Sequence, residues 1–340
     1  MVLLLLGLAA AILLDWQPDI RWSLTLPART PRPTAVQPTP TAQQAAALPT
    51  SEAMATAQSR QTAEARQRAI APTPTPSWRF FVRSPLEEAP HEDHYLLGRP
   101  IAPDGTDYIA YTYPYGSRGD GTYPIHHGVE FVNPIGTEIL AVGSGTIVAA
   151  GEDKTEVYGA RTDFYGRAII LKLDQTFRDE PVYVLYGHLS QIMVEEGQKV
   201  EAGEVIGLVG MAGIAEGPHV HLEVRYRENE YYYTANPVLW IRPFENHGTL
   251  AGAVVTNDGL PVPDARIILY QGSSTQPVRY MTSYPDRSVN PDPSWGENFA
   301  APDLPAGQWT VEVQHAGRSY SSSVTVTPGK TTWLTVYVAG

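Results

Sequence analysis

Four histidines and a glutamate in the central part of the chain carry the side chains that a metal-dependent hydrolase needs. His126 and Glu130 stand four residues apart, and His219 and His221 stand two apart. His188 lies between these two groups, in the segment Tyr-Gly-His-Leu-Ser. Imidazole and carboxylate groups bind zinc, and a catalytic zinc commonly takes three protein ligands and keeps a position for water. A fold that joins these segments would make a mononuclear metal site.

The pair His219 and His221 has the spacing of a strand rather than of a helix. Residues i and i+2 of a strand project from the same face, so one histidine can bind a metal while the other points into the same cleft. Glu223 continues that face and is expected to steady the strand or to accept a hydrogen bond from a ligand. A His-x-His pair alone is weak evidence, because histidines often lie on sheet surfaces, but two further histidine segments strengthen it.

A second histidine pair, His91 and His94, has a spacing that also suggests a metal site. The residues around it are polar and show no apolar period. We therefore predict a solvated loop there and no second metal centre.

The composition excludes several classes of binding and metal site. The chain has 340 residues, a formal net charge of -12 and 18% charged residues, so electrostatic attraction to nucleic acid is disfavoured. It contains no cysteine, which excludes disulfides, thiolate zinc sites and a lipid-modified N-terminal cysteine. Any metal must be held by histidine and carboxylate groups.

The first 77 residues are expected to position a folded part rather than to belong to it. Residues 1–25 contain the apolar run Val2–Leu14, which is short for a membrane span and suits a signal or membrane-anchor segment. Residues 26–77 are rich in Pro, Thr and Ala, a composition that predicts a disordered linker. This pattern favours export, with an uncleaved anchor preferred over a cleaved signal.

Residues 78–247 form the first predicted domain, which is all-β and antiparallel. Short β-rich runs follow one another with glycine turns between them and no helical period. The predicted strands are 137–142, 146–150, 168–173, 182–186 and 203–209.

Residues 248–340 form a second predicted β domain. Its strand candidates are 250–256, 265–270, 309–314, 322–327 and 332–338. The alternation Trp309, Val311, Val313 is typical of a strand with one buried face, so a β-sandwich is expected.

The central segment resembles the catalytic domain of the lysostaphin/LytM-type zinc endopeptidases of bacterial cell walls. That family has His-x-x-x-Asp, then a His followed by Leu, then His-x-His, and the framing at Gly136-Thr137 and Gly145-Thr146-Ile147-Val148 matches as well. The resemblance implies an antiparallel sheet of the duplicated hybrid motif type. It covers about a third of the chain.

Matched position by position, the resemblance makes His126 and His221 zinc ligands and places Glu130 where the family has Asp. His188 and His219 would be the catalytic histidines. Gly128, two residues after the first ligand in the family pattern, selects His126 over its neighbour His127, which is expected to be structural or exposed. Tyr115 and Tyr123 are candidates for donating to an oxyanion.

Two other segments resemble known domains. The region around Gly203–Gly213 is similar to biotin- and lipoyl-carrier domains, but those need a lysine that is typically next to methionine, and no Met-Lys pair occurs. The block 248–340 resembles the transthyretin-like regulatory domains found after some carboxypeptidases, through segments such as Asp258-Gly259-Leu260-Pro261. That resemblance implies an accessory or binding role.

The resulting prediction is an exported, membrane-anchored or secreted zinc endopeptidase that cleaves peptide bonds of cell-wall peptidoglycan. The alternative is a degenerate LytM-like domain that binds the wall or regulates another hydrolase. Glu130 supports this alternative because it stands where the family has Asp. A third possibility is a surface adhesion protein in which the C-terminal block does the main work. The expected partners are peptidoglycan peptides and, through the N-terminal segment, a membrane; the sequence does not indicate an oligomeric state.

Overall fold

The computed structural model of the protein describes residues 91–119 and 121–339, all of which lie in one compact unit, Thr50–Gly340. The predicted anchor at 1–25 and the linker at 26–77 fall outside the described residues. Among the residues that are described, no helix has the length and apolar character to cross a membrane.

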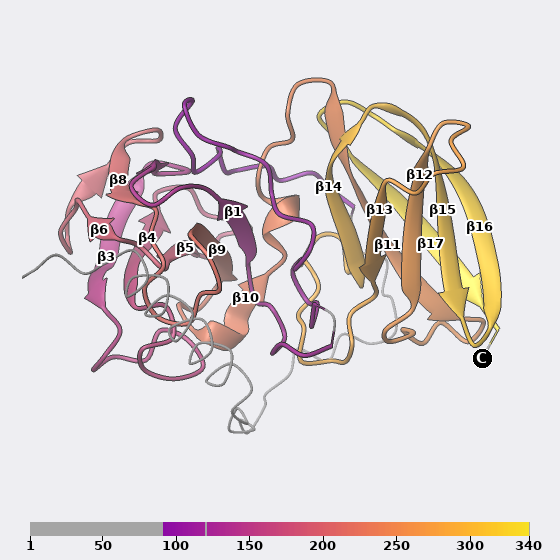
Figure 1. The fold of residues 1–340 in the computed structure, drawn as a ribbon, viewed down its shortest axis with the longest axis horizontal. Coiled ribbons are helices and arrows are strands. Elements are labelled where there is room, and N and C mark those ends of the chain that lie inside the picture. The colour runs from indigo at the N-terminus through magenta and orange to yellow at the C-terminus, as the bar shows by residue number, and fades with distance from the viewer. Residues whose placement is uncertain (1–90, 120, 340) are drawn as a thin grey trace, which may run out of the picture. The chain divides into compact units, whose positions relative to one another are not determined.

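The main sheet has the strand order β1-β9-β5-β4-β3-β7, with β10 also paired to β9 (Figure 1). All its pairings are antiparallel. Its strands are β1 (Val129–Val132), β3 (Gly145–Glu152), β4 (Arg167–Leu173), β5 (Val182–Gly187), β7 (Lys199–Val200), β9 (His219–Tyr226) and β10 (Thr234–Ala235). The predicted antiparallel all-β architecture is confirmed for this region.

A smaller sheet, in the order β2-β8-β6, shares a hydrophobic core with the main sheet. Its strands are β2 (Glu138–Leu140), β6 (Gln191–Ile192) and β8 (Val205–Leu208). Phe131, Ile147, Tyr186 and Val220 are fully buried in that core. Because core side chains hold the strands in register, they also fix the polar side chains on the opposite faces.

The C-terminal block, residues 247–338, consists of two further sheets, β14-β11-β17 and β13-β12-β15-β16. The strands are β11 (His247–Thr256), β12 (Arg266–Gln271), β13 (Arg279–Thr282), β14 (Phe299–Pro305), β15 (Gly307–His315), β16 (Arg318–Val326) and β17 (Thr331–Val338). One hydrophobic cluster draws side chains from both sheets. The predicted alternation is confirmed, since Trp309, Val311 and Val313 are all buried.

The C-terminal block differs from the prediction in two strands and one pairing. Strands β13 and β14 were not predicted, because neither has a clean alternation in the sequence. β17 pairs with β11 in parallel, which sequence alternation cannot indicate. The transthyretin-like assignment and the domain boundary at residue 248 stay predictions, and Ala251, Trp295 and Ala300 of this block belong to the same core cluster as the main sheet.

The prediction of a solvated loop at His91 and His94 was wrong for His94. This side chain is 5% exposed, and its Nε2 lies 2.9 Å from Asp292 Oδ2 of the C-terminal block. His91 stacks on Trp295 with ring centroids 5.2 Å apart. The partners lie about two hundred positions further along the chain, so no local pattern could reveal them.

Candidate metal centre and active site

Three neighbouring strands of the main sheet bring the sequence-distant histidines together. β9 lies between β1 and β5, and His221 of β9 stands opposite both Glu130 of β1 and Gly187 of β5. His126 lies just before β1 and His188 just after β5, and both rings lie beside His221: His126 Nε2 is 3.1 Å from His221 Nδ1, and the ring centroids of His188 and His221 are 5.7 Å apart. The sheet register thus accounts for a site assembled from three segments.

His126 and His221 face each other through ring nitrogens that lack a proton. His126 Nδ1 lies 2.6 Å from the Tyr113 carbonyl oxygen and His221 Nε2 lies 3.2 Å from Glu223 Oε1. Because these oxygens accept hydrogen bonds, each of these nitrogens carries the hydrogen of a neutral ring. The remaining nitrogens, His126 Nε2 and His221 Nδ1, lie 3.1 Å apart with lone pairs directed at each other. A cation between them would relieve this opposition.

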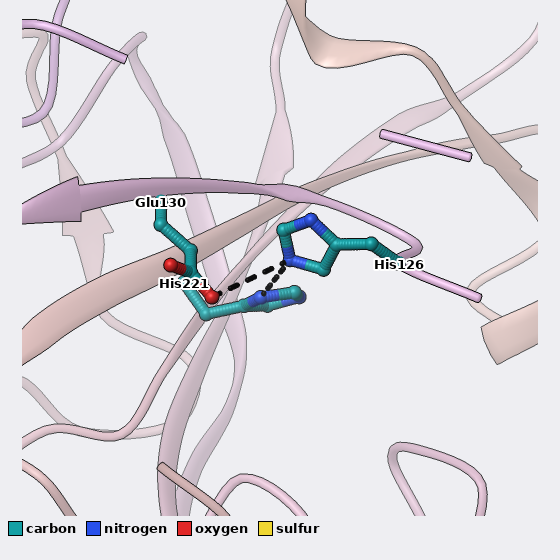
Figure 2. A group of neighbouring side chains, drawn as sticks. All are labelled: His126, Glu130 and His221. Atoms are coloured by element: carbon teal, nitrogen blue, oxygen red, sulfur yellow. Dashed lines mark hydrogen bonds and ion pairs between the residues drawn. The ribbon is translucent and has the colours of Figure 1, made fainter. Parts of the chain in front are cut away.

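Glu130 supplies the third group of this arrangement, and Figure 2 shows the three side chains converging. The Glu130 carboxylate Oε1 lies 3.8 Å from His126 Nε2 and 3.6 Å from His219 Nε2. The candidate donor atoms of His126, Glu130 and His221 all lie within 4.8 Å of one another. Two donors of a tetrahedral zinc site lie roughly 3.3 Å apart, so this donor set fits a zinc ion.

Gly128 is required by the close approach of the His221 ring. A Cβ on Gly128 would lie 2.7 Å from His221 Nε2 and 2.6 Å from the Leu222 carbonyl oxygen. Neither contact is tolerable for a real side chain. A residue larger than glycine would therefore displace the ring that faces His126.

His188 and His219 lie beside the three donors, and each is fixed through Nδ1. His188 Nδ1 donates to the Ala212 carbonyl and His219 Nδ1 donates to the Gly217 carbonyl, both at 2.8 Å. These bonds leave Nε2 as the second nitrogen of each ring, and the ring centroids are 4.8 Å apart. Within the described residues, His219 Nε2 is buried without a hydrogen-bond partner.

A buried polar network behind His221 fixes its orientation. Glu223 accepts hydrogen bonds from the Tyr165 hydroxyl and from the Arg225 guanidinium, with Arg225 Nη2 to Glu223 Oε2 at 2.7 Å. Arg225 Nη2 also donates to the Tyr158 carbonyl at 2.6 Å. Sequence reasoning named Glu223 but missed Tyr165 and Arg225. Arg225 extends the alternation of His219, His221 and Glu223 by one more step, a signal that could have identified it.

Burial sets the protonation of the cluster. Desolvation, and secondly the charge of His221, lower the pKa of His126 to about 3. Desolvation, followed by the neighbouring His219, holds the pKa values of His188 and His221 well below their usual range. Neutral imidazoles bind metals and accept protons.

The cluster opens into a cavity of about 460 Å³. Tyr113 lines it and stacks on His126 at 4.1 Å between centroids, and Tyr123 lines it while donating to Glu216 at 2.6 Å. Tyr115 is not brought to the cavity, because its hydroxyl donates to the carbonyls of Thr234 and Asn290. Of the two tyrosines predicted as oxyanion donors, only Tyr123 lies at the cleft.

His127 is buried and structural. Its Nδ1 lies 2.9 Å from Thr234 Oγ1 and its ring packs on Tyr231 at 4.4 Å between centroids. Burial, the largest influence, lowers its pKa to about 4. His127 also lines the cavity, but it is not among the three residues whose candidate donor atoms lie together.

Comparison with known proteins agrees with this geometry. Residues 124–233 match peptidase family M23. The matched segment spans the donors His126, Glu130 and His221 together with His188 and His219. An M23 peptidase domain is thereby supported for about a third of the chain, and with it a metallopeptidase type of site.

Named relatives match about a third of the chain. The chain is 33% identical over 102 residues to the peptidoglycan DD-endopeptidase ShyA of Vibrio cholerae, covering 30% of this chain and 20% of the relative. It is 37% identical over 112 residues to lysostaphin of Staphylococcus staphylolyticus, covering 33% of this chain and 20% of the relative. The chain thus spans a fifth of the length of these two relatives.

Among solved structures, the lysostaphin catalytic domain of Staphylococcus simulans matches with 30% identity and a TM-score of 0.31. That match covers 38% of this chain and 88% of the other.

Proposed function

We propose that residues 124–233 form a zinc-dependent endopeptidase that hydrolyses peptide bonds of cell-wall peptidoglycan. The observation that carries the proposal is the pair of unprotonated nitrogens, His126 Nε2 and His221 Nδ1, which face each other at 3.1 Å beside the Glu130 carboxylate. Burying two opposed lone pairs is costly unless a cation joins them. His126, Glu130 and His221 would hold the zinc ion.

The reaction then divides between the metal and the two flanking histidines. When bound, zinc supplies Lewis acidity to a water molecule and to the scissile carbonyl. His188 and His219 each present Nε2 to the cavity, so one of them can accept the proton of the attacking water. The histidine that has accepted this proton donates a hydrogen bond to the oxyanion and then transfers the same proton to the leaving amine. Tyr123 lies near enough to assist substrate orientation from the cavity wall.

The lining of the cavity supports cleavage within a peptide rather than at a free C-terminus. Among the described residues that line it, the acidic Glu130, Glu216 and Glu223 occur, but neither lysine nor arginine. A terminal carboxylate is usually held by such a cation. The apolar Val132 and Phe164 suit the uncharged backbone of a peptide cross-link. The two relatives above, named as a DD-endopeptidase and as lysostaphin, support this substrate class.

The test is metal content followed by activity on the full chain. Elemental mass spectrometry after dialysis should find about one zinc per chain. The purified protein should then release soluble peptides from isolated peptidoglycan. His221→Ala should lose both zinc and activity, whereas the matched control His315→Ala, in the C-terminal block, should keep both.

Absence of zinc even after it is added back would overturn the enzyme proposal. The alternative, a degenerate domain that binds the wall or regulates another hydrolase, would then be favoured, with Glu130 as the residue that departs from the family pattern. Wall-pelleting by the zinc-free protein would measure that binding directly.

We also propose that the enzyme works outside the cytoplasm, in the cell envelope. The support is the apolar run Val2–Leu14 and the Pro- and Thr-rich stretch that follows it, both read from the sequence. Fractionation of cells expressing the full chain should place it in the envelope, and recovery in the cytoplasm would contradict the proposal.

A further inference from the structure

The C-terminal block touches the wall of the cleft through the segment between β13 and β14. Tyr284 and Val289 of this segment form a buried cluster with Tyr115, against which Ile125 packs. The rings of Tyr115 and Tyr284 meet edge-on at 5.7 Å between centroids. Ile125 directly precedes His126, so this contact lies one residue from a proposed metal donor.

Hydrogen bonds also join the same segment to Tyr115 and to Tyr232 and Thr234, at and just before β10. The buried Tyr115 hydroxyl lies 3.0 Å from the Asn290 carbonyl oxygen and 3.1 Å from the Thr234 carbonyl oxygen. The Asn290 side-chain amide donates to the carbonyls of Tyr232 and Thr234 at 2.7 and 3.0 Å. Thr234 in turn holds His127 through its hydroxyl.

The turn after Tyr115 is hydrogen-bonded to the backbone of His126. Gly116 N donates to the His126 carbonyl at 2.8 Å, and His126 N donates to the Ser117 carbonyl at 2.9 Å. Gly116 has a φ of +76°, and a Cβ there would lie 2.5 Å from the Tyr284 ring. Tyr284 therefore packs directly on the turn that is paired with His126.

Tyr284 is itself held from two sides. Its hydroxyl donates to Glu297 at 2.7 Å and accepts a hydrogen bond from the Asn236 side chain at 2.8 Å. Arg118 and Asp286 add an exposed ion pair at 3.0 Å. The ion pair is exposed and contributes little, whereas the buried ring and its bonds fix the position of Tyr284.

We propose that residues 284–290 of the C-terminal block are a positioning element of the cleft, which fixes His126 through Tyr115 and Gly116. The block is thus a structural part of the site rather than an independent accessory. This inference rests on the proposed function only in taking His126 as a metal donor. Groups that orient a metal ligand typically alter metal affinity 10- to 100-fold when they are removed.

The test measures metal affinity by chelator competition, together with the visible spectrum of the cobalt-substituted full chain. Tyr284→Ala should weaken zinc binding about tenfold or more and shift the cobalt absorption bands. Tyr284→Phe, which keeps the ring against Gly116, should recover most of the affinity. Tyr270→Ala removes a tyrosine of the same block that bonds to Glu312, and it should behave as wild type.

Asn290→Ala is a milder variant for the case in which Tyr284→Ala does not fold, and it should weaken zinc binding measurably by removing the bonds to Tyr232 and Thr234. Folded variants with wild-type affinity and unchanged cobalt spectra would overturn the inference. If the wild type itself binds no metal, the proposed function fails, and amide hydrogen exchange then decides this inference. Faster exchange at Gly116 and His126 in Asn290→Ala would support it, and unchanged exchange would overturn it.

Discussion

Two buried clusters of histidine and carboxylate groups in this molecule differ in how fully their polar atoms are paired. In the inner cluster, His94 meets Asp292 at 2.9 Å and Asp292 N meets Glu297 Oε2 at 2.8 Å. In the cleft cluster, two ring nitrogens oppose each other, and His219 Nε2 is buried without a hydrogen-bond partner among the described residues.

The difference separates a structural from a functional use of the same side chains. Buried polar groups in a stable protein are normally paired, so a set that is closed on itself needs no ligand. Buried polar atoms without a partner raise the free energy of the folded protein, and a bound ligand or ion that pairs with them lowers it again. In the inner cluster the polar atoms are paired with one another, whereas in the cleft cluster some ring nitrogens lack a partner that a cation or a proton could provide.

The largest effect is expected from His219→Ala. Loss of its imidazole should reduce turnover about 10²- to 10⁴-fold, while the zinc content per folded molecule stays unchanged because His219 is not one of the three proposed donors. Peptidoglycan digestion and elemental analysis on the same sample would measure both. Normal turnover would remove His219 from the mechanism.

The converse is expected from His94→Ala in the inner cluster. Removing one partner of this buried pair leaves Asp292 uncompensated, which typically costs roughly 3–5 kcal/mol of unfolding free energy. Zinc affinity per folded molecule should change much less than in Tyr284→Ala, since His94 reaches Tyr284 only through Asp292 and Glu297. Urea denaturation measures the stability, and chelator competition measures the zinc affinity. A loss of zinc affinity as large as that of Tyr284→Ala in fully folded protein would show that the two clusters do not have separate roles.

Glu223→Gln tests whether the buried polar network behind His221 contributes to metal binding by the cleft cluster. An amide in place of the carboxylate weakens the acceptor for His221 Nε2 and leaves Arg225 buried without its ion pair. Zinc affinity should fall about 10- to 100-fold. Chelator competition gives the affinity, and the matched variant Glu312→Gln, in the C-terminal block, should leave it unchanged. An unaltered affinity in Glu223→Gln would mean that His221 is held by packing alone.

The smallest effect is a change in pH dependence at the inner cluster. Burial first, and the charge of Asp292 second, raise the pKa of Glu297 from 4.5 to about 8. Between these values the folded protein retains a proton that the unfolded chain releases. This contribution to stability is present in full below the unfolded pKa and is lost as pH rises through the folded pKa.

Glu297→Gln should therefore flatten the decline in unfolding free energy between about pH 5 and pH 8. Tyr284 and Asp292 face this carboxyl group, and His94 acts on it through Asp292, so only the difference between variant and wild type is diagnostic. Chemical denaturation of zinc-free protein at several pH values measures it. Identical slopes would show that Glu297 is ionised in the folded protein throughout this range.

The sequence predicted the cleft cluster far better than the inner one. His219, His221 and Glu223 share one strand face, and a period of two exposes that arrangement without any knowledge of the fold. Glu130 and His221 stand opposite each other because β1 pairs with β9. Only the family resemblance, and not the spacing of the motifs alone, suggested that these two residues lie together.

What the sequence could not reveal depends on contacts between distant segments. His94 appeared to lie in a polar loop because its partner, Asp292, belongs to the C-terminal block. Tyr115 was expected at the cleft, but Asn290 and Thr234 provide acceptors on the other side. Strand β17 joins β11 in parallel, a pairing that an alternating pattern does not encode.

The most direct test of the account is anomalous diffraction at the zinc absorption edge from crystals of the zinc-loaded protein. We expect one peak about 2.0–2.2 Å from His126 Nε2, His221 Nδ1 and a Glu130 carboxylate oxygen. A zinc-loaded crystal with no peak between these three atoms, or with the zinc bound elsewhere, would contradict the claim that the cleft cluster is a metal site.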